Sequence, residues 1–163
     1  MGARARSGSG FALVELLAAI VLINIGILAI LLTLNSGFVT LRRSAEASTS
    51  AAVADRQLER FRAIRYADIY LDTSALASVD ATYTGDEAYV TPLVNQTCSP
   101  LVATCTPSQE VTGPDGRTYR VDTYIVESAP TGGAPVKQVT VVVRRPSSSR
   151  VLARVTSVFG SDF

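Results

Sequence analysis

The residue types that enzymes most often use for chemistry are scarce in this chain. It has no histidine, the commonest general base and metal ligand, and only two cysteines, Cys98 and Cys105. Two cysteines cannot complete a zinc site of the Cys/His type. The sequence also contains no nucleophile elbow and no phosphate-binding loop. We therefore expect that the chain is not an enzyme and uses no cofactor and no metal.

One acidic residue, Glu15, stands in an unusual place. It is the only charged residue between Phe11 and Leu34, in a run that is otherwise apolar, small or uncharged. A carboxylate in an apolar layer costs several kcal/mol unless it is paired. Glu15 is therefore a candidate functional residue, although it lies near enough to the start of the run for its carboxylate to reach lipid headgroups.

The run that contains Glu15 predicts a membrane-spanning helix. A helix from Phe11 to Leu34 reaches roughly 36 Å, enough for a hydrocarbon core of about 30 Å. A cleavable secretory signal peptide is the alternative, but its apolar part is normally only about 7–15 residues long. Arg4 and Arg6 precede the run and favour a cytoplasmic N-terminus, although Arg42 and Arg43 follow it.

A short motif joins the basic leader to the apolar run. After Arg4 and Arg6 come Gly10, Phe11 and Glu15, within the letters G-F-A-L-V-E-L-L. This combination resembles the type III signal peptide of type IV pilins and type II secretion pseudopilins. One departure is Leu32, which stands where many pilins have a proline.

The resemblance implies a processing step and a partner for Glu15. A membrane-embedded prepilin peptidase would cut between Gly10 and Phe11 and N-methylate Phe11. Glu15 would then meet the N-terminal ammonium of a neighbouring subunit in a helical filament and set the axial register. The other implied partners are further pilin subunits, an inner-membrane assembly platform and, before assembly, membrane lipid.

The resemblance also implies where the chain works. We expect a single-pass inner (cytoplasmic) membrane protein with its N-terminus in the cytoplasm before assembly, and an extracytoplasmic filament afterwards. A minor pilin of a type IV pilus is favoured, and a minor pseudopilin of a type II secretion system or a competence pilus is the alternative. A bitopic membrane-anchored binding protein is a hypothesis of a different class.

The helical pattern continues beyond the apolar run, because no glycine or proline occurs from Leu41 to Ile69. We predict one helix from Phe11 to about Tyr66. One face of its second half carries small or apolar residues at helical spacing: Ala47, Ala51, Ala54, Leu58, Phe61 and Ile64. The remaining faces mix acids with bases, which favours a solvated surface over lipid or DNA binding. With a net charge of +1, no specific nucleic-acid partner is expected.

Two places in the predicted helix contain poor helix formers. Gly26 and the stretch from Asn35 to Gly37 are candidate points of local melting during assembly. An ordinary surface or interface glycine is the alternative at each place.

Beyond Asp72 the pattern changes to that of strands. Residues 117–128, 135–146 and 150–160 are rich in β-branched residues and predict three antiparallel strands with short connections. Tyr119, Val121, Thr123 and Ile125 share one strand face, as do Val139, Val141 and Val143. We predict that this apolar face covers the helix stripe. The fold class is then α+β: a long N-terminal membrane-spanning helix packed on a small C-terminal antiparallel sheet, the ladle-like arrangement of pilins.

These predictions divide the chain into four segments. Residues 1–10 form the prepilin leader, 11–40 the transmembrane or filament-core half of the helix, 41–70 its amphipathic half, and 71–163 an extracytoplasmic β-rich pilin domain.

The loops of the last segment hold the remaining candidate residues. Cys98 and Cys105 enclose six residues, and outside the cytoplasm we expect them to form a disulfide. Free thiols or a redox pair are the alternatives. We predict that the loop acids are solvated and are not calcium ligands, because no D-x-D-x-D-G pattern occurs; they are Asp72, Asp80, Asp86, Glu87 and Asp115.

Overall fold

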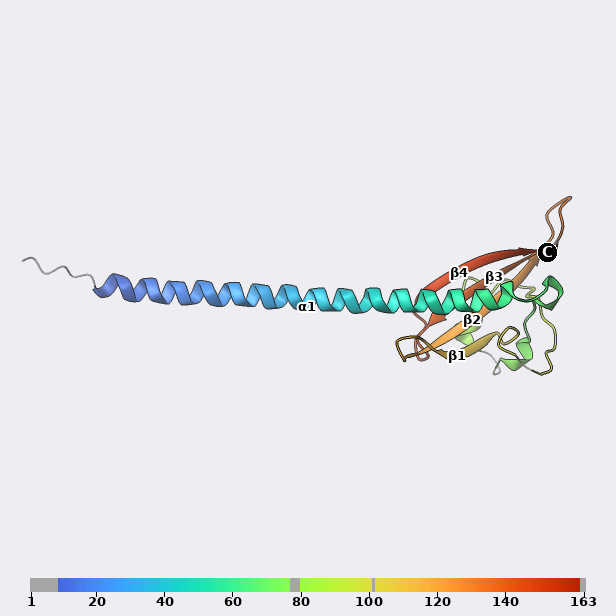
Figure 1. Ribbon diagram of the computed structural model, residues 1–163, viewed down its shortest axis with the longest axis horizontal. Coiled ribbons are helices and arrows are strands. Elements are labelled where there is room, and N and C mark those ends of the chain that lie inside the picture. The colour runs from blue at the N-terminus through green and yellow to red at the C-terminus, as the bar shows by residue number, and fades with distance from the viewer. Residues whose placement is uncertain (1–8, 77–79, 101, 162–163) are drawn as a thin grey trace, which may run out of the picture. The chain divides into compact units, whose positions relative to one another are not determined.

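The structure is a computed structural model that describes residues 9–76, 80–100 and 102–161. The chain divides into two compact units, of which the first ends at Ser44 and the second begins at Ala45. A single long helix, α1 (Ser9–Arg62), begins in the first unit and ends in the second (Figure 1). The rest of the second unit contains a four-stranded antiparallel sheet, so the predicted α+β class is confirmed.

The sheet has four antiparallel strands in the order β1-β2-β3-β4. The strands are β1 (Ser108–Thr112), β2 (Thr118–Ser128), β3 (Val136–Arg144) and β4 (Val151–Gly160). The last three agree with the three strands predicted at residues 117–128, 135–146 and 150–160. β1 was missed, because its sequence SQEVT has only one apolar residue and does not alternate.

The main core lies between the second half of α1 and one face of the sheet. Leu58 and Phe61 of α1 are buried in one cluster with Val121, Val139 and Val141. In Figure 1 the last turns of α1 lie along the strands. The predicted contact between the helix stripe and the valine face is therefore confirmed.

The predicted stripe was partly wrong at its N-terminal end. Ala47 is exposed, whereas Ser50 is the first buried side chain among residues 13–62 of α1. The hydroxyl of Ser50 donates to the backbone oxygens of Glu46 and Ala47, each at 2.9 Å. These bonds remove the cost of burying a polar group, while leaving the single methyl of Ala47 in water costs little.

The helix also ends earlier than predicted, at Arg62 and not near Tyr66. The chain then turns so that Ile69 and Leu71 enter the core. Lys137 of β3 holds this turn, because its Nζ donates to the backbone oxygens of Tyr66 and Ile69 at 2.9 Å. Burial lowers the pKa of the Lys137 ammonium, whose hydrogen bonds replace lost contacts with water.

The opposite face of the sheet is covered by the chain between the helix and β1. Tyr83, on the short helix α2 (Ala81–Thr84), stacks on Tyr124 of β2 with ring centroids 4.4 Å apart. The Tyr83 hydroxyl donates to the backbone oxygen of Thr123 at 2.6 Å, and the Tyr124 hydroxyl donates to that of Tyr83 at 3.0 Å. These bonds satisfy both hydroxyls, so this smaller core can bury two tyrosines.

Candidate functional site

The motif residues Gly10, Phe11 and Glu15 all lie in the first two turns of α1. Ser9 begins the helix, two residues earlier than predicted, and residues 1–8 of the predicted leader lie outside the described part of the chain. The bond proposed for cleavage, between Gly10 and Phe11, is therefore helical here. Glu15 is exposed and makes no hydrogen bond or ion pair with any residue that the structure describes.

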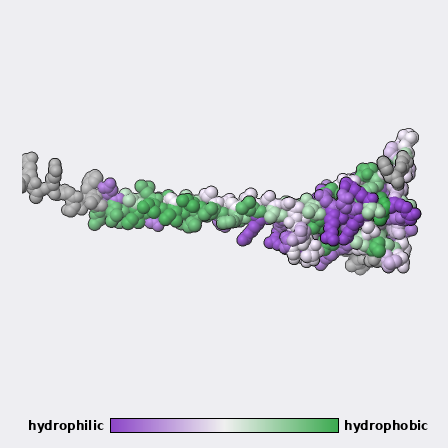
Figure 2. Space-filling view, in the orientation of Figure 1, coloured by the Kyte–Doolittle hydropathy of each residue, from purple (hydrophilic) through white to green (hydrophobic). Residues whose placement is uncertain are grey.

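The first unit presents an apolar surface around Glu15. Every large apolar side chain described between Leu13 and Leu41 is exposed, for example Leu22 at 69% and Leu32 at 72%. Figure 2 shows this hydrophobic covering along the N-terminal part of α1. The helix is long and apolar enough to cross a membrane by length and composition. Exposed apolar patches of this extent are typical of surfaces that interact with another protein or with a membrane.

Other polar side chains within this apolar helix differ from Glu15, because the helix itself satisfies them. Asn24 donates to the backbone oxygen of Ile20 at 2.8 Å. Thr33 and Thr40 donate to backbone oxygens four residues earlier, at 2.9 and 3.0 Å. Such local bonds let amides and hydroxyls remain in apolar surroundings at small cost. The carboxylate of Glu15 cannot use them, since backbone oxygens are acceptors and it needs a donor.

The helix is continuous through both predicted weak points. Gly26 and the stretch from Asn35 to Gly37 lie within α1, and a methyl group added at either glycine would meet nothing within 4 Å. Both glycines thus occupy ordinary exposed helical positions in this single chain.

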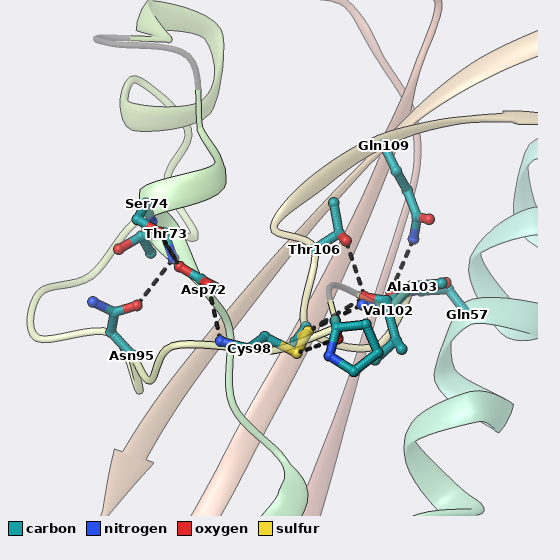
Figure 3. Close-up of a disulfide and its surroundings, with 12 residues drawn as sticks. Gln57, Asp72, Thr73, Ser74, Asn95, Cys98, Val102, Ala103, Thr106 and Gln109 are labelled. Carbon is teal, nitrogen blue, oxygen red and sulfur yellow. Dashed lines mark hydrogen bonds between the residues drawn. A yellow bond between two sulfur atoms is a disulfide. The ribbon is translucent and has the colours of Figure 1, made fainter.

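The disulfide between Cys98 and Cys105 is present, in agreement with the prediction from spacing. Figure 3 shows how the loop that it closes is attached to its surroundings. Gln57 of α1 and Gln109 of β1 both donate to the backbone oxygen of Ala103, at 2.9 and 3.1 Å. The disulfide loop is therefore fastened to the helix and to the sheet as well as closed by its own sulfur bond.

Asp72 holds the other end of the same loop. Its carboxylate accepts from the hydroxyl of Ser74 and, at 2.9 Å, from the backbone N–H of Cys98. These two bonds hold the pKa of Asp72 below its usual value. Asp72 is buried, so its prediction as a solvated loop acid was wrong.

We expect Gln57→Ala to loosen the disulfide loop and to lower the free energy of unfolding of the second unit by about 1–2 kcal/mol, since Gln57 is 3% exposed and its amide bridges two elements. Urea denaturation of the full chain in detergent, followed by tyrosine fluorescence, would measure this change. Arg56→Ala is the matched control, because Arg56 is adjacent and exposed. Equal effects of the two substitutions would refute the bridging role.

Two further loop acids belong to a partly buried ion-pair network on the far face of the sheet. This arginine–aspartate network consists of Asp80, Asp86, Asp122, Arg120, Arg144 and Arg154. Arg120 lies 2.5 Å from Asp80 and 2.8 Å from Asp122, and Arg144 binds both Asp86 and Asp122. The prediction that Asp80 and Asp86 are solvated was therefore wrong.

The remaining two loop acids, Asp115 and Glu87, are both exposed, in agreement with their prediction as solvated acids. Asp115 also accepts from the hydroxyl of Tyr119 at 2.8 Å in the turn between β1 and β2. No group of three or more potential metal ligands gathers among residues 9–76, 80–100 and 102–161. The acids with partners stabilise loops and the sheet.

The ion-paired acids predict a loss of stability at low pH. Burial acts to raise the pKa of Asp80, but hydrogen bonds from Arg120 and from the backbone outweigh it and the pKa lies below its usual value. A carboxylate with a lowered pKa in the folded state stabilises the fold above its unfolded pKa, about 3.9. That contribution is lost as pH falls through the folded pKa. We expect the urea midpoint to be constant from neutral pH to about pH 5 and to fall below about pH 4.

The matched variant for this pH dependence is Asp80→Asn. It should lower stability at neutral pH and flatten the decline in acid, because the substituted amide does not titrate. A decline of the same steepness in the variant and the parent chain would show that Asp80 does not contribute to it.

Comparisons with family models, with curated proteins and with solved structures find no match to this chain. The assignment of a function therefore depends on its own residues, above all Gly10, Phe11 and Glu15.

Proposed function

We propose that the chain is a structural subunit, of the minor pilin kind, of a type IV pilus-like filament. It is anchored in the inner membrane by the apolar half of α1, cut by a prepilin peptidase between Gly10 and Phe11, and assembled by an inner-membrane platform with other pilin subunits. The observation that carries the proposal is Glu15, a carboxylate without a partner in the described chain, five residues after the proposed cut in the exposed apolar half of α1.

The physical chemistry of α1 supports two successive environments. An apolar helix with all of its large side chains exposed is stable when lipid or other apolar helices surround it. In lipid, Glu15 near the helix start reaches the headgroups. Among other helices it needs a cation, and cleavage before Phe11 creates one, because it frees an amino group on a neighbouring copy.

The second unit suits display outside the cytoplasm. Its disulfide between Cys98 and Cys105 is of a kind that persists in oxidising compartments.

The experiment that tests the proposal is coexpression of the full chain with a prepilin peptidase, followed by intact-mass measurement. We expect the chain to lose its first ten residues and to gain one methyl group in place of a hydrogen, a net addition of CH2. Gly10→Leu should prevent the loss, because a side chain at this position obstructs the peptidase. An unchanged mass for the parent chain would overturn the proposal and favour a bitopic membrane-anchored binding protein.

A further inference from the structure

A groove lies between α1 and the turn that joins β1 to β2, within the second unit. Its volume is about 530 Å³. Val53, Val111 and Pro114 contribute apolar walls, and two arginines of α1, Arg56 and Arg60, line the same groove. The groove thus combines an apolar interior with two positive charges, which suits a partner that carries acids beside small or apolar groups.

The positive charges of the groove are only weakly engaged within the chain. Arg56 is exposed and has no hydrogen bond or ion pair with any described residue. Arg60 donates to the amide oxygen of Gln57 at 3.1 Å, which is a neutral partner. An acid that entered the groove would therefore compete with no internal carboxylate for either arginine.

The neighbouring face of α1 carries charges of the opposite sign at the same spacing. Asp55 and Glu59 are four residues apart, as are Arg56 and Arg60. Like charges at this spacing face each other on a helix and destabilise it. Asp55 is exposed without a described partner, and Glu59 pairs with Arg62 only on the surface, where both side chains are more than half exposed. Such a surface pair is weak and exchanges easily.

We propose that the groove receives the acidic row of a second copy of this chain, so that Asp55 and Glu59 of one copy meet Arg56 and Arg60 of the next. Four residues of helix span about 6 Å in both rows, so two helices that run parallel bring both pairs into register. The two surfaces differ, and the contact therefore repeats from copy to copy in an open array. This inference rests on the proposed function and names a contact that would order the subunits of the proposed filament.

The first test identifies the occupant of the groove. A photoreactive benzophenone amino acid replaces Thr112, which is exposed and lines the groove. The full chain is expressed with a prepilin peptidase, its assembly machinery and a second, differently tagged copy. We expect cross-links to the second copy between about Ala52 and Ala63. Cross-links only to another polypeptide or to lipid, or no cross-link, would overturn the inference.

The second test exchanges the charges. Arg56→Glu in the photoreactive copy should lower the cross-link yield about fivefold, and Asp55→Arg in the tagged copy should restore it. Neither residue has a described partner within the chain, so both variants should fold. Arg150→Glu, another exposed arginine, is the control and should leave the yield unchanged. A yield insensitive to Arg56→Glu would refute the contact.

Intact mass measured on the same samples separates this inference from the proposed function. Processing at Gly10 depends on the start of α1 and not on the groove. A processed chain that assembles equally well with Arg56→Glu would refute the groove contact and leave the filament proposal standing. An unprocessed chain would refute the filament proposal, whereas the cross-link and its charge dependence would still decide the groove contact.

Discussion

Replacement of Arg144 with methionine is expected to lower the free energy of unfolding of the second unit by about 3 kcal/mol. Arg144 is 2% exposed, and its guanidinium binds the carboxylates of Asp122 and Asp86. Methionine would fill the space and leave both carboxylates without this cation. The loss should lie at the lower end of the range for a broken buried pair, because Arg120 still lies 2.8 Å from Asp122 and Arg154 lies 3.0 Å from Asp86.

The measurement is urea denaturation of the full chain in detergent, followed by tyrosine fluorescence. The chain has six tyrosines and no tryptophan, and Tyr124 lies on the same sheet face as the network. Arg117→Met is the matched control, since Arg117 is 64% exposed and 3.8 Å from its partner Asp115, and should cost less than about 0.5 kcal/mol. If Arg144→Met cost no more than this control, the network would not stabilise the unit.

A double variant separates the network from simple packing. Arg144→Met combined with Asp122→Leu removes a cation and an anion together, and it should recover part of the stability lost by Arg144→Met alone. Replacing both members of a buried ion pair by apolar groups is commonly close to neutral. Additive losses would indicate that the two residues act independently.

The sheet and its contact with the helix could be predicted because both follow from local apolar periodicity. Val139, Val141 and Val143 alternate along one strand, and Leu58 and Phe61 recur at helical spacing. Each pattern shows within a dozen residues which side chains turn inward. Two apolar faces in a small unit must then cover each other.

The polar part of the same interface could not be predicted in this way. Ser50 and Gln57 are buried on the helix face because each has hydrogen-bond partners, and Gln57 finds its acceptor in Ala103, far along the chain. The arginine–aspartate network also depends on partners that lie far apart in the sequence. Asp86 is separated by 58 residues from Arg144, so no short window of sequence reveals that its charge is paired and buried.

The candidate site contains one feature that local sequence predicts fully and one whose proposed partner lies outside the chain. The spacing of Cys98 and Cys105 was sufficient to predict their disulfide, because the pairing is local. The significance of Glu15 depends on its distance from Gly10 and Phe11 and on the apolar run, and these are sequence features. Its proposed cation belongs to another copy of the chain, so the motif identifies Glu15 whereas contacts within one chain do not.

Replacement of Glu15 with alanine is expected to leave membrane insertion intact and to lower incorporation into filaments about a hundredfold. Insertion should persist because removing a carboxylate makes the span more apolar, even near its headgroup end. Incorporation should fall because the N-terminal ammonium of the neighbouring copy would be left unpaired among apolar helices. Loss of one partner of a buried pair costs about 3–5 kcal/mol. A cost of about 3 kcal/mol corresponds to the expected hundredfold fall in incorporation.

The measurement compares the variant in sheared filaments with the variant in the membrane fraction, by quantitative immunoblot against the parent chain. Thr33→Val is the matched control, because it also replaces a polar side chain of the same helix by an apolar one. Among the described residues, the Thr33 hydroxyl bonds only to the backbone oxygen of Ala29 in its own helix, so its loss should leave incorporation within about twofold. Glu15→Asp should incorporate at an intermediate level, since it keeps the charge on a shorter side chain. Equal incorporation of Glu15→Ala and Thr33→Val would contradict a register role for Glu15, whereas a processed, membrane-bound chain that is missing only from filaments would place the ion pair at the assembly step.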